Sequence, residues 1–220
     1  MLPSSTLLAF DTSAAHCAAA LLLGDKVITR IDEMAKGQAE HLMPMLEDML
    51  SQENVAWADL DAIGVGTGPG NFTGIRISVA AARGLALGLG KPAIGISTLE
   101  AQVYGLRGTI ISCLDARRDR VYAQVLSDTT DGTDAALCDL TTTSLPSLSA
   151  NLAPRAVGPV ADAVSQITGY PSAAQSCPTI EGIARLAAQR IGTNSARPTP
   201  LYIRSADAAP PRDPAPQILS

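Results

Sequence analysis

The sequence predicts an α/β fold of two lobes, and three observations support that prediction. The 220 residues are 46% hydrophobic and 17% charged, which is typical of a globular chain long enough to bury a core. Strand-like apolar segments alternate with helix-like segments along the first half of the chain. An apolar strand that ends at an acid occurs twice, at Asp11 and at Asp115, and this echo suggests a duplicated architecture.

The first lobe is expected over residues 1–106 and opens with three antiparallel strands. These are predicted at residues 6–11, 17–23 and 26–31, with a hairpin turn at Gly24 and Asp25. A helix over residues 38–53 follows, because apolar residues recur there at helical spacing, namely Leu42, Met45, Leu46, Met49 and Leu50. The remaining predicted elements are a strand at 62–66, a helix at 73–89, a strand at 93–97 and a third helix that starts at the capping box Ser97–Glu100.

The second lobe is expected over residues 107–205 and is smaller. Strands are predicted at residues 109–115 and 121–126, followed by a polar, loop-dominated stretch at 127–154. A helix with Thr179 as its cap is predicted at residues 179–191. Residues 206–220 are rich in proline, so we expect them to form a mobile tail.

Charge and cysteine content exclude several classes of protein. The formal net charge of −5 argues against a chain that binds nucleic acid by itself, because such binding needs a clustered positive field. The four cysteines lie far apart without a CxxC pair, which favours reduced thiols in a cytoplasmic protein. No signal-peptide pattern opens the chain and no long uninterrupted apolar segment occurs, so we expect neither secretion nor a membrane span.

The glycine-rich segment from Gly66 to Arg76, GTGPGNFTGIR, lies between a predicted strand and a predicted helix. Such a turn lets the backbone approach a phosphate, a partner helix or the chain's own sheet, and these three interpretations stay open. A Walker loop ends in Lys followed by Ser or Thr, whereas this turn has no Lys and also fails the dinucleotide spacing. Arg76 is the only cation close by, so phosphate binding by this turn alone is disfavoured.

The segment Asp11-Thr12-Ser13 invites two interpretations. An acid at a strand end followed by hydroxyl residues resembles the first phosphate loop of the actin, hexokinase and sugar-kinase superfamily. The alternative, which the pattern alone favours, is an Asx or Ser turn that closes the first hairpin. The two histidines, His16 and His41, form no recognisable set of metal ligands, and no nucleophile elbow is present.

The helix predicted at residues 73–89 has an unusually smooth face. Gly74, Ser78 and Ala82 recur at intervals of four residues, so another helix can approach closely along this stripe. Together with the methionine-rich stripe of the preceding helix, the face is predicted either to lie in the chain's own core or to form a partner interface.

Several motifs together resemble the bacterial TsaB (YeaZ) family of tRNA threonylcarbamoyladenosine biosynthesis proteins, over about residues 6–204. The motifs are Leu8–Ser13, His41–Leu46, Gly66–Arg76, Gly84–Ala86, Ile94–Leu99, Asp115–Arg117, Val121-Tyr122 and Pro200–Arg204. The resemblance implies an actin-like ATPase (ribonuclease H-like, ASKHA) fold of two lobes, each with a mixed sheet flanked by helices.

The resemblance also implies an accessory subunit rather than an enzyme. Such a scaffold or activator pairs with the catalytic paralogue TsaD and works with the ATPase TsaE to modify adenosine 37 of ANN-decoding tRNAs. It reaches tRNA through the complex, and it forms a homodimer when alone. TsaD carries a His-x-x-x-His metal pair in the helix after the strand that corresponds to 93–97, where this chain has Thr98 and Gln102. Hydroxyl and amide groups are poor substitutes for an imidazole pair, so we expect no catalytic residue and no metal site.

The resemblance and the helix pattern together define the expected site residues. The expected partner interface comprises His41, Leu42, Met45, Met49, Gly74, Ser78, Ala81, Ala82 and Leu85. Substituting Ser78 or Ala82 by Arg is expected to break the heterodimer and leave the monomer folded. A vestigial or shared nucleotide loop is expected at Asp11, Thr12, Ser13, Gly68, Gly70 and Arg76. No cofactor is expected to bind independently, and any ATP or ADP contact is expected at a subunit interface of the complex. The alternative is a stand-alone ATP-binding enzyme of the actin-like superfamily or a peptidase.

Overall fold

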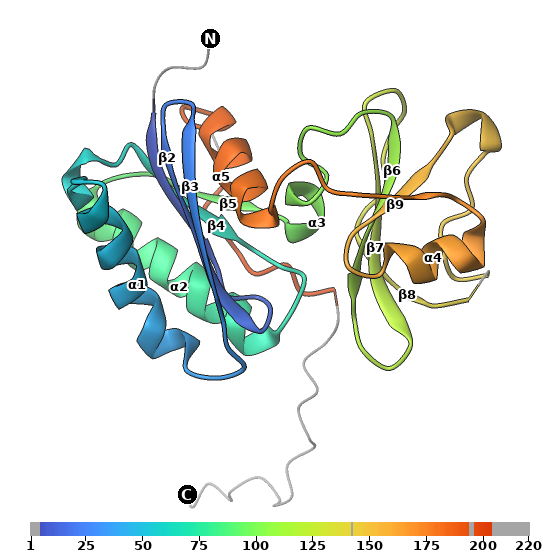
Figure 1. The fold of residues 1–220 in the computed structure, drawn as a ribbon, viewed down its shortest axis with the longest axis horizontal. Coiled ribbons are helices and arrows are strands. Elements are labelled where there is room, and N and C mark those ends of the chain that lie inside the picture. Colours follow the sequence, from blue (N-terminus) through green and yellow to red (C-terminus); the bar gives the residue numbers. More distant parts are fainter. Residues whose placement is uncertain (1–4, 142, 194–195, 204–220) are drawn as a thin grey trace, which may run out of the picture.

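The structure is a computed structural model that describes residues 5–141, 143–193 and 196–203. Two lobes lie side by side, and each is built around a five-stranded mixed sheet (Figure 1). The predicted α/β fold of two lobes is therefore confirmed.

The sheet of the first lobe contains β1 (Thr6–Asp11), β2 (His16–Leu23), β3 (Lys26–Glu33), β4 (Ala62–Gly66) and β5 (Ala93–Ile96), in the order β3-β2-β1-β4-β5. The first three strands pair antiparallel, and β4 and β5 continue the sheet parallel to β1. All five predicted strands are confirmed. Strand β5 ends at Ile96 because the Ser97 hydroxyl caps the next helix, accepting from Leu99 N–H.

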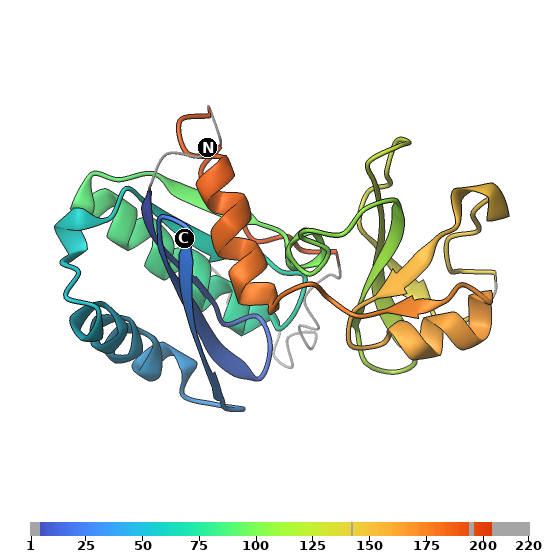
Figure 2. The ribbon, with the colours of Figure 1, turned by 45° about the horizontal axis from the view of Figure 1, so that its top comes forward.

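Helices cover both faces of the first sheet. α1 (Gln38–Gln52) and α2 (Phe72–Leu89) pack on one face, and α5 (Thr179–Gln189) packs on the other (Figure 2). The apolar stripe of α1 is buried as its spacing predicted. Pro44 lies inside α1, and the helix continues through it. Because period-two strands send side chains to both faces, Leu8 and Phe10 join one core while Leu7 and Ala9 join the other.

The sheet of the second lobe repeats the topology of the first. It contains β6 (Thr109–Asp115), β7 (Arg120–Ser127), β8 (Ala136–Asp139), β9 (Arg155–Val157) and β10 (Ser172–Ala173), in the order β10-β9-β6-β7-β8. Strands β6, β7 and β8 are antiparallel, and β9 and β10 extend the sheet in parallel. Asp11 and Asp115 end equivalent strands, so the duplication inferred from their echo is confirmed.

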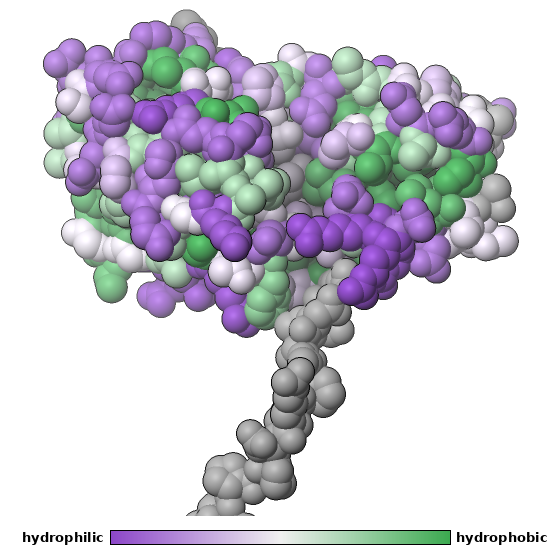
Figure 3. Space-filling view, turned by 60° about the horizontal axis from the view of Figure 1, so that its bottom comes forward, coloured by the Kyte–Doolittle hydropathy of each residue, from purple (hydrophilic) through white to green (hydrophobic). Residues whose placement is uncertain are grey.

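Helices cover less of the sheet in the second lobe than in the first. α4 (Ala161–Thr168) packs on one face of its sheet, and only part of the other face meets α3 (Thr98–Ala101), a single turn between the lobes. Figure 3 shows a broad hydrophobic area on this lobe, whereas hydrophobic residues on the first lobe are more scattered in that view. The short elements β8, β9, α4 and β10 were not predicted, nor were the 3₁₀ turns Trp57–Asp59 and Ala150–Leu152.

Helix α5 corrects the predicted lobe boundary. It falls inside the range 107–205, yet Ile180, Ile183 and Ala187 pack against the sheet of the first lobe. The chain therefore enters the second lobe after α3 and returns to the first before α5 (Figure 1). The predicted cap is also wrong, because Pro178 takes the cap position and Thr179 is the first helical residue. The predicted tail at residues 206–220 lies outside the described residues.

Within the described part of the chain, α2 is the one helix that is long and apolar enough to span a membrane by length and composition. Core helices of globular proteins pass the same test. Arg76 and Arg83 interrupt this helix, and its buried side packs on the first sheet. Only 28% of the helix is buried, so a large, mostly apolar face of α2 points away from the lobe.

Candidate functional site

The glycine-rich turn after β4 encloses the loop that follows β1. A Cβ atom added to Gly66, Gly70 or Gly74 would lie closer than 3.0 Å to an atom of Asp11, Ser13 or Thr12 respectively, a separation that real Cβ atoms essentially never show. Asn71 N–H also donates to Ser13 O at 2.6 Å. The spacing of these glycines thus fits the chain's own loop, the third of the interpretations that the sequence left open.

The same turn is also held by segments from elsewhere in the chain. Thr98 N–H donates to Gly68 O, and Leu201 N–H donates to Thr67 O, both at 2.8 Å. Gly68 has φ +88°, a conformation that favours glycine. The turn is therefore a junction where the loop after β1, helix α3 and the C-terminal segment meet.

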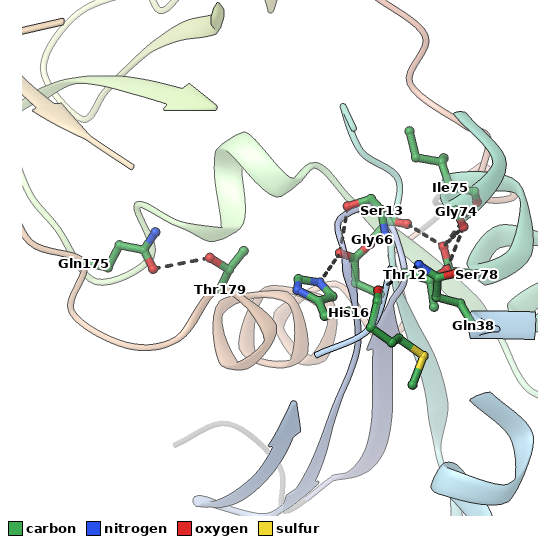
Figure 4. A network of polar contacts seen from close by, with 12 residues as sticks. Thr12, Ser13, His16, Gln38, Gly66, Gly74, Ile75, Ser78, Gln175 and Thr179 are labelled. Carbon is green, nitrogen blue, oxygen red and sulfur yellow. Dashed lines mark hydrogen bonds and ion pairs between the residues drawn. The ribbon is translucent and has the colours of Figure 1, made fainter. Parts of the chain in front are cut away.

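Ser13 and His16 lie close together after β1 (Figure 4), and both contact the buried carboxylate of Asp11. The Ser13 hydroxyl donates to Asp11 Oδ2 at 2.8 Å, and His16 Nε2 lies 3.4 Å from the same oxygen. The hydrogen bond between His16 and Asp11, together with the negative charge of Asp11, raises the pKa of His16 above its usual value, although burial opposes the shift. Ser13 N–H also donates to Asp11 Oδ1 at 3.3 Å, so the Asx turn that the sequence offered as an alternative is present. The contact of His16 with this turn was not predicted from the sequence.

These three side chains do not have the geometry of a serine hydrolase. In a catalytic triad the histidine lies between the serine and the acid and takes the proton of the hydroxyl. Here Asp11 lies between Ser13 and His16, and the hydroxyl donates to the carboxylate. Burial raises the pKa of all four cysteine thiols, to about 11 for Cys17 and to about 12 for Cys113, which disfavours a reactive thiolate.

A cavity of about 1200 Å³ lies between the two lobes. Asp11, Ser13 and His16 line its first-lobe wall, and Asp115, Arg117 and Tyr122 line its second-lobe wall. Of the six residues of the predicted nucleotide loop, Asp11, Ser13 and Gly70 line this cavity, whereas Thr12, Gly68 and Arg76 do not. Thr12 is buried and donates to Gly74 O at 2.6 Å. The structure therefore brings only half of that loop to the cavity.

Gln102, one of the two positions at which the resemblance implies an imidazole in TsaD, lies in a buried hydrogen-bond network. Gln102 Nε2 donates to Ser112 Oγ at 2.6 Å and to Cys113 O at 3.2 Å, and Ser112 Oγ donates to Leu99 O. This buried network joins α3 to the second lobe. Thr98 Oγ1 is buried without a hydrogen-bond partner among the described residues. In that part of the chain no group of three or more His, Cys, Asp or Glu side chains is placed to hold a metal ion.

Most residues of the predicted partner interface lie inside the first lobe. Leu42, Met45, Met49, Gly74, Ser78 and Ala82 are all buried. Because Ser78 and Ala82 are 0% exposed, replacing either by Arg would disrupt this lobe, which corrects the expectation of a folded monomer. Only His41, Ala81 and Leu85 of the predicted set are partly exposed.

The exposed face of α2 is the one opposite the predicted stripe. It presents Thr73, Arg76, Ala80, Arg83, Gly84 and Leu87, and Leu87 is 84% exposed. A Cβ atom at Gly84 or at Gly88 would meet nothing within 4 Å. The strip at Ala80, Gly84 and Gly88 is thus open to close approach, and Arg76 and Arg83 border it.

A charged network lies between α1 and β3. Arg30 joins Asp32 and Asp48 at 3.0 and 2.8 Å, and His41 Nε2 lies 2.7 Å from Asp32 Oδ2. The hydrogen bond to His41, then that to Arg30, holds the pKa of Asp32 below its usual value. His41 is therefore fixed on the rim of α1 rather than free on the surface.

Comparisons with known proteins agree on one family. The family model described as "TsaD: tRNA N6-adenosine threonylcarbamoyltransferase" matches residues 31–196. The tRNA threonylcarbamoyladenosine biosynthesis protein TsaB of Escherichia coli is 34% identical over 121 residues, which cover 53% of this chain and 52% of that protein. The chain thus spans about half the length of the curated TsaB relatives that it matches first.

Two further relatives match over nearly the whole chain. An uncharacterised protein of Mycobacterium tuberculosis is 32% identical over 213 residues, or 94% of this chain and 95% of that protein. The solved structure of YeaZ from Pseudomonas aeruginosa has a TM-score of 0.73 and 26% identity, and the match covers 90% of this chain and 99% of that one. These matches confirm the actin-like fold that the motifs implied.

Proposed function

The chain belongs to the TsaD/TsaB family of tRNA threonylcarbamoyladenosine biosynthesis proteins, and from this premise we propose that it is a non-catalytic subunit in that pathway. In this proposal it acts as a scaffold or activator of the catalytic paralogue TsaD, together with the ATPase TsaE. The complex transfers the threonylcarbamoyl group to adenosine 37 of ANN-decoding tRNAs. This role places the protein in the cytoplasm.

One observation carries the non-catalytic part of the proposal. Thr98 and Gln102 occupy the positions of the paralogue's metal-binding imidazoles, and the Gln102 amide is committed to Ser112 and Cys113. An amide binds a metal ion through its oxygen rather than through a nitrogen, and Gln102 Oε1 already accepts from Gln175 Nε2 at 3.4 Å. The donor set at this position therefore does not fit a catalytic metal.

The proposed docking surface is the outer face of α2. Small residues at Ala80 and Gly84 permit close approach of a partner helix, and exposed Leu87 supplies an apolar contact. We propose TsaD as the partner, and a second copy of this chain as the occupant when TsaD is absent. The net charge of −5 supports contact with tRNA through the complex rather than by this chain alone.

A nucleotide contact, if the complex makes one here, is proposed at the subunit interface. Arg76, the cation closest to the glycine-rich turn, is exposed on α2 beside the docking surface and outside the cavity between the lobes. ATP or ADP would therefore need groups from the partner to complete its phosphate site.

The docking proposal is tested by placing a large side chain on the outer face of α2. Gly84→Arg keeps the helix, since Arg is a better helix former than Gly, but it obstructs close approach. We expect this variant to lose co-purification with TsaD while its thermal unfolding stays that of a folded protein. Gln166→Arg, on an exposed position of α4 in the second lobe, is the matched control and should keep the complex. Survival of the complex in Gly84→Arg would refute the proposed surface.

The alternative function is a stand-alone ATP-binding enzyme, which the cavity with Asp11 and Asp115 favours. Calorimetry with ATP and magnesium on the isolated chain separates the two functions. The accessory role predicts no turnover. Tight binding with turnover that is lost in Asp11→Ala would replace the accessory role by the enzymatic one.

A further inference from the structure

Arg76 on α2 is held between two aromatic side chains from distant parts of the chain. Its guanidinium carbon lies 3.8 Å from the centre of the Phe72 ring and 5.7 Å from that of Tyr202. Its Nε donates to Tyr202 Oη at 2.8 Å, and the two rings lie 4.8 Å apart at 34°. The three side chains form one cluster, the Arg76 cluster, at the start of α2.

Tyr202 reaches this cluster because the chain after α5 returns across the first lobe. Leu201 N–H donates to Thr67 O at 2.8 Å, which anchors the segment to the glycine-rich turn. Ile203, the last described residue, packs with the small apolar cluster of the second lobe around Tyr122. Tyr202 is thus fixed by its two neighbours, yet it remains 44% exposed. An aromatic residue anchored in this way and still exposed is typical of a recognition surface.

The cluster leaves the charged end of Arg76 available. No carboxylate of the described residues lies within ion-pair distance of it, whereas Arg30, Arg185 and Arg190 each pair with an acid of this chain. The Phe72 ring and the Tyr202 hydroxyl occupy one face and Nε of the guanidinium. No hydrogen bond from the two terminal nitrogens to a described residue is found, and the two can donate in parallel, the geometry that binds a carboxylate through two hydrogen bonds.

The position of the cluster links it to the docking surface. Arg76 is four residues before Ala80 and eight before Gly84, so it borders the smooth outer face of α2. A partner helix that lies on Ala80 and Gly84 would bring its own side chains to Arg76. A protein carboxylate fits this arrangement better than a nucleic-acid phosphate, because a chain of net charge −5 lacks the field that RNA binding requires.

We propose that Arg76 binds an Asp or Glu side chain of the protein that covers the outer face of α2, and that Tyr202 positions Arg76 for this contact. The inference rests on the proposed docking to TsaD. It adds the requirement that the contact surface of TsaD carries an Asp or Glu side chain opposite the first turns of α2. The rigid aromatic support lowers the entropy that Arg76 loses on binding.

Arg83 provides a matched control for Arg76. It lies seven residues further along α2, on the same edge of the helix, and is equally exposed, but none of the aromatic contacts found around Arg76 involves it. The test is the dissociation constant of the complex with TsaD, measured by calorimetry for the full-length chain and for its variants Arg76→Ala, Arg76→Lys, Tyr202→Phe and Arg83→Ala.

We expect Arg76→Ala to weaken binding about tenfold or more, and Arg83→Ala to change it by less than about threefold. Arg76→Lys keeps the charge but loses the planar fork, so it should recover only a small part of the loss. Tyr202→Phe keeps the ring stack and loses the hydrogen bond, so its effect should be intermediate. Raising the salt concentration should weaken the binding of the original chain to TsaD more than it weakens the binding of Arg76→Ala.

The outcomes separate this inference from the proposed function. If the original chain binds TsaD and Gly84→Arg does not, but Arg76→Ala and Arg83→Ala bind alike, the docking proposal stands and the carboxylate contact is overturned. A full rescue by Arg76→Lys would overturn the positioning role of Tyr202. If Arg76→Ala binds TsaD as the original chain does but weakens the binding of added tRNA to the complex, the partner chemistry is wrong. Absence of any complex with the original chain would refute both.

Discussion

The two lobes share one sheet topology but differ at the equivalent ends of β1 and β6. In the first lobe Asp11 is buried with Ser13 and His16, and three glycines of the following turn make room for that loop. In the second lobe Asp115 is exposed, and its carboxylate accepts only from the nearby Arg117 N–H at 2.8 Å among the contacts described. In the second lobe the glycine that approaches the end of β6 is Gly158, whose added Cβ would overlap Cys113 O.

The loop after β1 is therefore tightly packed, whereas the equivalent loop after β6 is exposed. The loop of the first lobe is fixed from all sides and leads directly into α2, the proposed docking helix. The hairpin tip of the second lobe places Arg117, Arg118 and Asp119 at φ between +54° and +60°, without glycine. We infer that the first lobe is built for a rigid surface, and that the second lobe is the less constrained of the two.

The largest effect is expected from a methyl group inside the first-lobe loop. Gly74→Ala would press a Cβ atom against Thr12 O, so the free energy of unfolding should fall by about 3 kcal/mol. Gly84→Ala on the same helix meets open space and should raise it by about 0.5 to 1 kcal/mol. Urea unfolding of both variants measures the contrast. Equal free energies of unfolding for Gly74→Ala and Gly84→Ala would show that the loop after β1 does not require a glycine at position 74 in order to pack.

The next effect concerns the network that joins the lobes. Gln102→Ala removes the donor to Ser112 Oγ and Cys113 O in a buried site, so we expect a loss of about 2 kcal/mol. Gln52→Ala is the control, because its exposed amide donates to Asp48 within α1 and does not reach the second lobe. Hydrogen exchange should quicken in the second lobe of Gln102→Ala but not in that of the control. Unchanged exchange would contradict a joining role for Gln102.

A smaller, stabilising effect is expected at Thr98. Its buried hydroxyl has no hydrogen-bond partner among the described residues, and valine has the same shape without that group. Thr98→Val should therefore raise the free energy of unfolding by up to about 1 kcal/mol. Thermal unfolding checks this, with Thr109→Val as the control, because the Thr109 hydroxyl is paired with Ser127 at 3.1 Å. Destabilisation by Thr98→Val would mean that this hydroxyl is bonded in solution.

The smallest effect is a pH dependence confined to the first lobe. The folded state raises the pKa of His16 above 6.5 through Asp11 and, more weakly, Glu33. The pair therefore adds stability that is fully present below the unfolded pKa and is lost as the pH rises through the folded pKa. Asp11→Asn should reduce this slope, whereas Asp115→Asn should leave it unchanged. Urea unfolding across that pH range measures the slope, and an identical slope in Asp11→Asn would refute the pairing.

The sequence was sufficient for the long elements and for the duplication. Strands β1, β2 and β4 are continuous apolar runs and α1 has a clear helical spacing, so each was predicted nearly to its ends. Strands β9 and β10 have three and two residues, too few for any period to be read, and they exist because β6 offers an edge to pair with. The lobe to which α5 belongs is a tertiary property, set by Ile180 and Ile183 packing on β1 and β4.

The candidate site was predicted less well than the fold. The spacing of Gly74, Ser78 and Ala82 identified a smooth stripe on α2, but spacing alone does not tell which face of a helix meets its own sheet. The motif residues Arg76 and Tyr202 were both noted, yet their contact spans 126 positions along the chain and no local pattern encodes it. Likewise, only the fold places His16 against Asp11.

The central claim is that this chain is required for tRNA threonylcarbamoyladenosine synthesis without performing the chemistry. The most direct measurement is the transfer of the threonylcarbamoyl group to tRNA by a mixture of this chain, TsaD and TsaE, with each protein omitted in turn. We predict that transfer depends strictly on this chain, and that this chain alone gives none. Full transfer without it, or transfer by it alone, would contradict the account.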